Sequence, residues 1–401
     1  MRAFMILFAL GLAGACDPSP VDLEDLDPGD LEPPPDPDLQ TASTPKQVTT
    51  NGCTNTFDFE KELVIRDLAV VEDPVRTTGT GAWTFGHALA ELAGTHDPKA
   101  MARAWLQTWA ESPRIDGERI DGNASKVQDV LLAPWNETTF ALAKAPFRLL
   151  AIVLRPEAAV GPEMRLIYGA TSPSGAALPM TVAFEYRVTR AFMVRWHETL
   201  APLAQGSAAY RDAIAQLTED GIHDATRPNG SSLVQLRTNE AAIDFPWDLR
   251  EFRLSADGAT LARAKLAGQP KVKFDGDARL ATGVTPAMET FQAVVPSEDF
   301  AWNVPGMAAQ DRRRFALTTC AGCHSRETRT AFVQIKPREK GERAQISAFL
   351  QSRTCEANDA ACKKLDAAGE FTDPITPHRF TVQDDRMASL NAVLAAAGSC
   401  Q

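Results

Sequence analysis

The sequence predicts an α+β fold, in which helices pack on a largely antiparallel sheet, followed by a small and mainly helical C-terminal region. Two observations support this class. Between residues 147 and 266 the predicted strands and helices occur in clusters, whereas a doubly wound α/β chain alternates them strictly. After Pro305 the strand patterns give way to helices and loops. With 401 residues, the chain is long for one compact domain and comfortable for two.

The folded chain is predicted to begin near Cys53 with one strand and then several helices. Aliphatic residues over 63–71 predict a strand that ends at Pro74. Apolar residues then recur at helical spacing from Leu89 to Leu106, and Asp97-Pro98 is typical of a helix start. A further short helix is predicted around 127–131.

The sheet itself is predicted from residue 147 onward. Residues 181–186 alternate between apolar and polar side chains, as in a sheet with one covered face. Turn residues separate the predicted strands, which lie at 148–155, 164–168, 180–188, 233–237, 247–254 and 260–266. Helices are predicted at 192–203, 208–217, 307–317, 344–350 and 387–397, with a turn at 228–230.

Charge is unevenly distributed along the chain. The formal net charge is −11, but residues 17–45 hold nine acids and no Lys or Arg. Without those acids and Arg2, 43 acids stand against 40 bases, so the folded part is nearly balanced and we expect no nucleic-acid partner. Residues 16–50 are acidic and proline-rich, which predicts a disordered tether ahead of an α+β domain at 51–300.

The first fifteen residues are typical of a signal peptide, because Arg2 precedes a short apolar run and the small residues Ala13-Gly14-Ala15. The run is too short to span a membrane. The segment before Cys16 resembles the lipobox of bacterial lipoproteins, which implies lipidation of Cys16; an ordinary signal peptidase would also accept Ala13-Gly14-Ala15. With Cys16 lipidated, six cysteines remain, an even number that suits an oxidising compartment. We therefore expect a protein of the bacterial cell envelope, anchored to the membrane by its N-terminal lipid on the periplasmic or outer-surface side.

Residues 320–324, Cys-Ala-Gly-Cys-His, form the most specific motif of the chain. This spacing is that of c-type haem attachment, in which two thiols form thioethers with the haem vinyl groups and the adjacent imidazole binds the iron. Three other interpretations remain open. Cys320 and Cys323 could form disulfides, ligate zinc, or act as a redox pair. A structural zinc site needs four protein ligands, and a thioredoxin-like pair would follow a strand in a βαβ unit rather than a predicted helix.

Over its last 90 residues the chain resembles c-type cytochrome domains, and as a whole it resembles exported bacterial proteins that end in such a motif. The resemblance implies a helical domain at 301–401 with one covalent haem c on Cys320 and Cys323 and with His324 as proximal iron ligand. It also implies a distal ligand before the last helix. Met387 lies 63 residues after His324, and His378, 54 residues after it, is the alternative. A redox partner protein is implied, but nothing in the sequence identifies it.

Four cysteines remain for disulfides if haem occupies one pair. They allow three connectivities. Cys355 and Cys362 would close a short local loop, which leaves Cys53 and Cys400 to join the two ends of the folded chain. Without haem, six cysteines allow fifteen connectivities. Basic residues after the motif, among them Arg326, Arg329, Lys336 and Arg338, are expected on a solvated face rather than on haem propionates.

An enzymatic hypothesis would have to draw on the larger domain. Glu185, Glu240 and Glu251 lie in or beside predicted strands, near Arg237 and Arg250, but no nucleophile, metalloprotease or phosphate-binding motif accompanies them. We expect these charges to lie on the open face of the sheet. The remaining histidines, His87, His96, His197 and His223, are interpreted as structural or exposed, without ligand-like spacing.

The sequence thus favours an exported, lipid-anchored monohaem electron-transfer protein with an accessory domain of unknown specificity. The alternative is a cofactor-free, disulfide-stabilised surface lipoprotein with a binding or structural role. A third hypothesis is a haem-dependent oxidase or peroxidase that works at the interface between the two domains.

Overall fold

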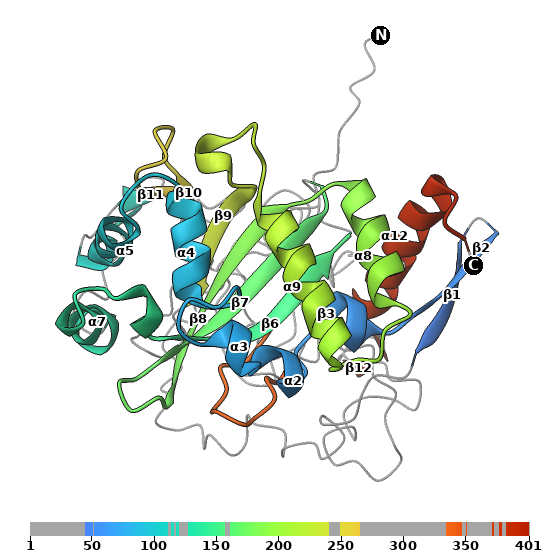
Figure 1. Ribbon diagram of the computed structural model, residues 1–401, viewed down its shortest axis with the longest axis horizontal. Coiled ribbons are helices and arrows are strands. Elements are labelled where there is room, and N and C mark those ends of the chain that lie inside the picture. The colour runs from blue at the N-terminus through green and yellow to red at the C-terminus, as the bar shows by residue number, and fades with distance from the viewer. Residues whose placement is uncertain are drawn as a thin grey trace, which may run out of the picture.

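The computed structural model describes residues 45–50, 52–110, 114–115, 118–119, 127–156, 161–239, 249–264, 334–346, 350, 371–372, 377–378 and 382–400. A seven-stranded sheet forms its centre, in the order β11-β10-β9-β8-β7-β6-β3, with every neighbouring pair antiparallel. β6 to β11 follow one another as a meander, and β3 adds to the edge at β6 (Figure 1). The strands are β3 (Val64–Ile65), β6 (Phe147–Arg155), β7 (Glu163–Thr171), β8 (Ala177–Arg187), β9 (Leu233–Asn239), β10 (Leu249–Leu254) and β11 (Leu261–Ala264). The predicted α+β class with an antiparallel sheet is confirmed.

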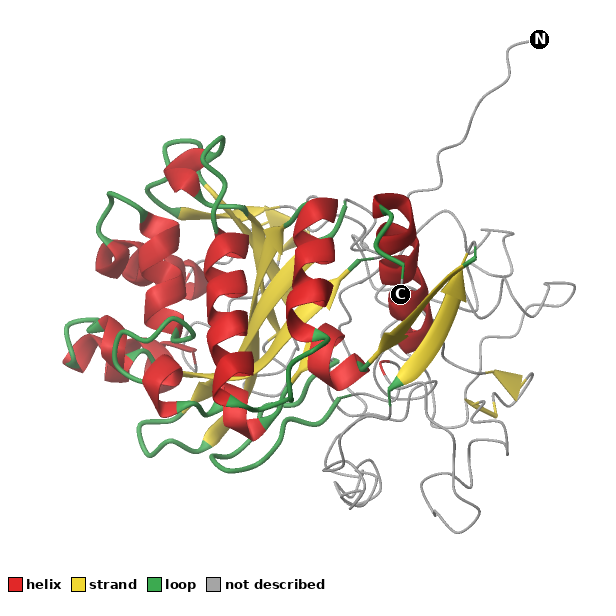
Figure 2. Ribbon diagram, turned by 45° about the vertical axis from the view of Figure 1, so that its right-hand side comes forward, coloured by secondary structure: helices red, strands yellow, loops and turns green. Residues whose placement is uncertain are grey.

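Helices cover one face of this sheet, with α4 and α9 lying across it (Figures 1 and 2). They fall in the two long connections of the sheet, from β3 to β6 and from β8 to β9. The helices of these connections are α2 (Leu68–Val71), α3 (Pro74–Thr77), α4 (Phe85–Ala93), α5 (Pro98–Gln107), α7 (Ala133–Glu137), α8 (Arg190–Leu200) and α9 (Ala208–Ile222). Single helical turns add to them at Phe59–Leu63, Thr108–Ala110, Gln128–Leu132, Leu142–Lys144 and Pro228–Gly230.

Local capping explains where α4 and α5 begin. The Asp97 carboxylate accepts a hydrogen bond from the Lys99 amide, and Pro98 occupies the first turn of α5, as the sequence predicts. The Thr84 hydroxyl caps α4 by accepting from the His87 amide. In each case a short polar side chain satisfies a backbone N–H that the helix leaves without a partner.

Three predicted segments differ in the structure. Residues 68–71 form α2 rather than the continuation of a strand, because the Asp67 side chain accepts from the Ala69 amide and starts a helical turn. Lys46–Thr50 forms strand β1, paired with β2 (Cys53–Phe57), so the tether predicted through residue 50 ends earlier. The helix predicted from residue 344 is wrong at its start, since Ile346 makes a β-bridge with Ile335.

The last helix, α12 (Val382–Ala397), begins five residues before the predicted 387 and packs against the β1–β2 hairpin (Figure 1). Its buried Asn391 amide donates to the carbonyl oxygens of Val48 (3.1 Å) and Cys53 (3.0 Å), and its oxygen accepts from Asn55 Nδ2 at 2.6 Å. A buried amide whose groups are all paired is stabilising and fixes the helix in one register on the hairpin.

The described parts of region 301–401 share one hydrophobic cluster with the larger part of the chain. Ile335, Ile346, Met387, Leu390 and Leu394 belong to that cluster. The predicted boundary near residue 300, the helix at 307–317 and any cytochrome-like fold lie outside the described residues. Two short antiparallel hairpins lie outside the central sheet: β4 (Arg114–Ile115) with β5 (Glu118–Arg119), and β12 (Phe371–Thr372) with β13 (Pro377–His378).

Candidate functional site

The motif residues Cys320, Cys323 and His324 lie outside the described residues, as do Cys16, Cys355 and Cys362. The two predicted distal ligands lie within them. His378 is paired with Phe371 in the β12–β13 hairpin. Met387 is buried, 3% exposed, on the stripe of α12 that also carries Leu390, Asn391 and Leu394. Its thioether therefore packs in the hydrophobic cluster, and its role as an iron ligand stays a prediction.

A disulfide joins Cys53 at the start of β2 to Cys400 just beyond α12. The two α-carbons are 5.2 Å apart, within the usual range for this bond. The bridge spans 347 residues and clasps the two ends of the described fold, which is the pairing expected if Cys355 and Cys362 form the local loop. Long-range disulfides persist in oxidising compartments and are rare in the cytosol.

Residues 334–346 form a docked loop closed by the Ile335–Ile346 bridge. Arg338 is 3% exposed, contacts the Glu72 carboxylate, and donates to the carbonyl oxygens of Val71 (3.3 Å) and Leu149 (3.1 Å). The prediction that Arg338 lies on a solvated face is therefore wrong. Burial alone would raise the pKa of Glu72, but its hydrogen bonds from the Gly341 amide and Arg338 outweigh burial and lower it.

Arg343 anchors the second half of this loop. It contacts Glu60, which also pairs with buried Arg66 at 2.5 Å, and Arg66 donates to the Ala344 carbonyl oxygen at 2.6 Å. These charge-assisted bonds hold the loop against the sheet domain.

Glu185 and Glu251, both expected on an open face, lie instead in a ladder of ion pairs on the sheet face opposite α4 and α9. The ladder alternates in charge across five strands: Arg155, Glu163, Arg165, Glu185, Arg237, Glu251 and Arg253. Both carboxylates are 1% exposed. The expectation of solvated charges is therefore wrong for them, and Arg250 lies on the other face, over the Trp109 ring.

Glu185 is the best-connected carboxylate of the ladder. It lies 3.1 Å from Arg165, 3.8 Å from Arg237, and accepts a hydrogen bond from Gln235 at 2.5 Å. Burial by itself would raise the pKa of Glu185, but the two arginines and Gln235 outweigh burial and lower it. A general acid at neutral pH needs a raised pKa, so the Glu185 carboxylate does not fit that role. The ladder is better explained as a device that fixes strand register.

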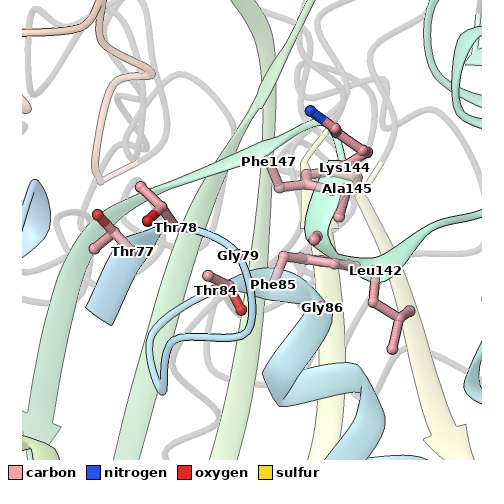
Figure 3. Close-up of a pocket in the computed structure, with 11 residues that line it drawn as sticks. Thr77, Thr78, Gly79, Thr84, Phe85, Gly86, Leu142, Lys144, Ala145 and Phe147 are labelled. Carbon is pink, nitrogen blue, oxygen red and sulfur yellow. The ribbon is translucent and has the colours of Figure 1, made fainter. Parts of the chain in front are cut away.

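The described residues also form a pocket of about 370 Å³ beside the start of α4 (Figure 3). Three threonine hydroxyls in its lining, those of Thr77, Thr78 and Thr84, donate to backbone carbonyls three or four residues earlier in the chain. Gly86 is required here, because a β-carbon would lie 2.3 Å from the Leu142 carbonyl oxygen. Among the described lining residues none is His, Cys, Asp or Glu, so the pocket lacks an acid–base pair.

The fold brings together a group of side chains that the sequence patterns did not predict. His87 and Glu91 lie one turn apart on α4, and Glu219 and His223 lie one turn apart at the end of α9. The ligand atoms of His87, Glu91 and Glu219 lie within 4.8 Å of one another. His87, interpreted from the sequence as structural or exposed, belongs to this group, and His223 lies beside it, 3.4 Å from Glu219. The available signal was a His-x-x-x-Glu spacing at the start of the helical stretch predicted from Leu89, and a Glu-x-x-x-His spacing just after the helix predicted at 208–217.

Comparisons with models of protein families, with curated proteins and with solved structures found no match to this chain. Within the described ranges, no helix combines the length and the apolar character needed to cross a membrane.

Proposed function

We propose that this chain is an exported, lipid-anchored monohaem c-type electron-transfer protein, with the sheet domain as an accessory domain of unknown specificity. In this proposal Cys320 and Cys323 bind haem covalently, His324 is the proximal iron ligand, and Met387 or His378 is the distal ligand. Cys16 carries the lipid that holds the protein at the bacterial cell envelope.

The observation that carries the proposal is the Cys53–Cys400 bridge, taken together with the motif. A disulfide that closes the whole fold supports an exported chain, because such bonds are rare in the cytosol. In an oxidising compartment, two further thiols at CxxCH spacing either form disulfides, with each other or with other cysteines, or are held in another linkage. Thioether bonds to haem provide that linkage and use the adjacent histidine.

The competing proposal is a cofactor-free surface lipoprotein with a binding or structural role. Two observations favour it. The bridge already shows that cysteines of this chain form structural disulfides. Met387 lies on a helical stripe that packing alone explains, together with Leu390 and Leu394.

Haem attachment separates the two proposals. Full-length protein should be expressed in a periplasm that contains the c-type maturation machinery. The haem proposal predicts a red protein whose haem remains on the polypeptide in a denaturing gel, since thioethers survive denaturation. Cys320→Ser and Cys323→Ser should lose most of this haem stain. The matched controls Cys355→Ser and Cys362→Ser should keep it.

A colourless product whose non-lipid cysteines all resist alkylation until reduction would overturn the haem proposal and support the cofactor-free one. If the protein is red, His324→Ala should change the iron spectrum in both oxidation states. Because Met387 is buried, Met387→Leu is the informative change: leucine keeps most of the packing volume and removes the thioether. Only the true distal ligand, among Met387→Leu and His378→Ala, should alter the oxidised spectrum.

The predicted boundary near residue 300 is tested by limited proteolysis between Thr290 and Pro305. The Cys53–Cys400 disulfide determines the expected result. A single cut there should leave the two fragments together on a non-reducing gel and separate them only after reduction, because Cys53 and Cys400 lie on opposite fragments. Resistance throughout this segment would argue for one fused domain.

The lipid anchor has its own test. Labelled palmitate should enter the wild-type chain and not Cys16→Ser. Equal labelling of both would contradict the proposed anchor and leave the haem proposal untouched.

A further inference from the structure

Two helices that are far apart in the sequence present paired His and Glu side chains to each other. His87 and Glu91 are four residues apart on α4, and Glu219 and His223 are four residues apart across the end of α9. Side chains at this spacing lie on the same face of a helix. Their exposures range from 20% for His87 to 48% for His223, so the group lies in a half-open position between the helices.

Three distances between neighbouring polar atoms are close to those around a single small cation. Glu219 Oε2 lies 3.1 Å from His87 Nε2, and Glu219 Oε1 lies 3.4 Å from His223 Nε2. His223 Nε2 is 3.7 Å from Glu91 Oε2. For a tetrahedral ion with ligands at about 2.0–2.1 Å, neighbouring ligand atoms are separated by roughly 3.3 Å. His87, Glu91 and Glu219 already have their ligand atoms within 4.8 Å of one another. His223 contacts both carboxylates from the other side, and a side-chain rotation would add it as a fourth ligand.

A buried phenol below the helices gives an independent observation. Tyr186 projects from β8, is 1% exposed, and its hydroxyl has no hydrogen-bond partner among the described residues. Burial is the main cause of its raised pKa, with further contributions from the charges of Tyr168, Glu219 and Glu91. The phenol therefore lies within electrostatic reach of both carboxylates.

We propose that His87, Glu91, Glu219 and His223 form a binding site for one zinc-type divalent transition metal that ties α4 to α9. Two carboxylates and two neutral imidazoles balance the charge of one such ion. Imidazole is a good ligand for zinc and its neighbours, whereas calcium and magnesium prefer all-oxygen sites. The ligands come from the connection before β6 and from the connection before β9, so a bound ion would join two separate parts of the helical layer.

The site is independent of the haem proposal, since it uses none of the cysteines. The test uses the full-length protein, stripped with a chelator and then dialysed against micromolar Zn²⁺. We expect one zinc ion per chain and a raised Tm, because binding to the native state alone stabilises it. Glu219→Gln should weaken binding at least 100-fold and abolish the rise in Tm, since Glu219 contacts both histidines. His87→Ala and His223→Ala should each weaken binding at least tenfold.

Matched controls remove the same side-chain types elsewhere. The two controls are His96→Ala and Glu198→Gln. His96 lies outside the group, and its ring contacts the Asp257 carbonyl oxygen, while Glu198 lies on the exposed face of α8. Both should bind zinc like the wild type. The four ligands are partly exposed, so circular dichroism should show the same fold in every variant.

X-ray absorption at the zinc edge excludes the cysteines as the source of binding. Only nitrogen and oxygen neighbours, at about 2.0–2.1 Å, are expected, whereas cysteine ligation would add sulfur at about 2.3 Å. Sulfur at that distance, zinc affinity unchanged in Glu219→Gln, or no zinc retained by the wild type would each overturn the proposal.

Discussion

The two faces of the central sheet stabilise the same strands by different chemistry. On the face below α4 and α9, Phe85 stacks on Phe147 at 4.0 Å and meets Tyr168 and Phe184 edge-on, at 5.4 and 5.3 Å. On the opposite face the same strands carry the ladder of ion pairs. The alternation is clear on β7 and β8, where Leu166 lies opposite Phe184 and the adjacent residues, Arg165 and Glu185, lie opposite each other.

The difference shows how one sheet obtains both stability and register. The aromatic face gains its stability from buried area and ring geometry, which many registers would supply in part. The charged face is specific, because a one-residue slip would turn every ladder side chain toward the apolar layer. Buried ion pairs add little net stability, but they strongly penalise an arrangement that separates the partners. The first face thus makes the sheet stable, and the second makes one pairing unique.

The largest effect should come from the centre of the aromatic face. Phe85 is 1% exposed and contacts five other aromatic rings. Phe85→Ala should lower the free energy of unfolding by about 3–5 kcal/mol, because it removes this contact area and leaves a cavity. Phe85→Leu, which fills part of the space, should cost clearly less. Urea denaturation measures both. Equal losses in the two variants would mean that volume at Phe85 does not determine the stability of this face.

On the charged face, removing one partner should cost somewhat less. Glu185→Gln keeps the size of the side chain but leaves Arg165 and Arg237 without the charge between them. We expect a loss of roughly 3 kcal/mol, since breaking a buried ion pair leaves an uncompensated charge. The matched control, Glu198→Gln on the exposed side of α8, should change stability by less than about 0.5 kcal/mol. A Glu185→Gln protein as stable as this control would show that the Glu185 ion pairs contribute nothing measurable to the free energy of unfolding.

Lowering the pH should weaken the charged face and leave the aromatic face unchanged. The loss of stability should be smaller than that caused by either substitution at pH 7. The pKa of Glu185 is lower in the folded protein than its ordinary value, so its contribution is present above the unfolded pKa, near 4.3, and is lost as the pH falls through the folded pKa. The stability gap between wild type and Glu185→Gln should be full at pH 7 and should shrink below about pH 4.3. The gap for Phe85→Leu has no such cause and should stay constant. Denaturation curves at several pH values test this contrast, and a Glu185→Gln gap that does not change with pH would contradict it.

The fold class was predictable because it depends on local signals. The clusters of strands between residues 147 and 266 reappear as β6 to β11, and Asp97-Pro98 starts a helix as expected. The errors also have local causes. Residues 68–71 are aliphatic and suit a strand, but the Asp67 cap and the following Asp73-Pro74 start place two short helices there. Capping bonds of this kind outweigh a weak β preference in a four-residue segment.

The arrangement of charges was less predictable, because it depends on tertiary contacts. Arg338 was expected in solvent, yet it is buried against Glu72, 266 residues earlier in the chain. The zinc-type group needs α4 and α9 to lie side by side, which their separate sequences do not determine. The Cys53–Cys400 pairing followed from cysteine spacing only after two other pairs were assumed. The haem motif remains a prediction from sequence.

The smallest of the four effects concerns the helix that covers the centre of the aromatic face. Thr84 caps α4 by accepting a hydrogen bond from the His87 amide, and α4 carries both Phe85 and two of the proposed metal ligands. Thr84→Ala should cost about 1 kcal/mol, the usual loss for an N-cap. Thr84→Ser retains the hydroxyl and should keep most of that stability. Glu185→Gln made in the Thr84→Ala background should lower the free energy of unfolding by as much as it does in the wild type, because the cap and the ladder share no partner. Urea denaturation of the two single variants and the double variant tests this. A double variant that departs from additivity by more than about 0.5 kcal/mol would show that the two faces are coupled through the strands.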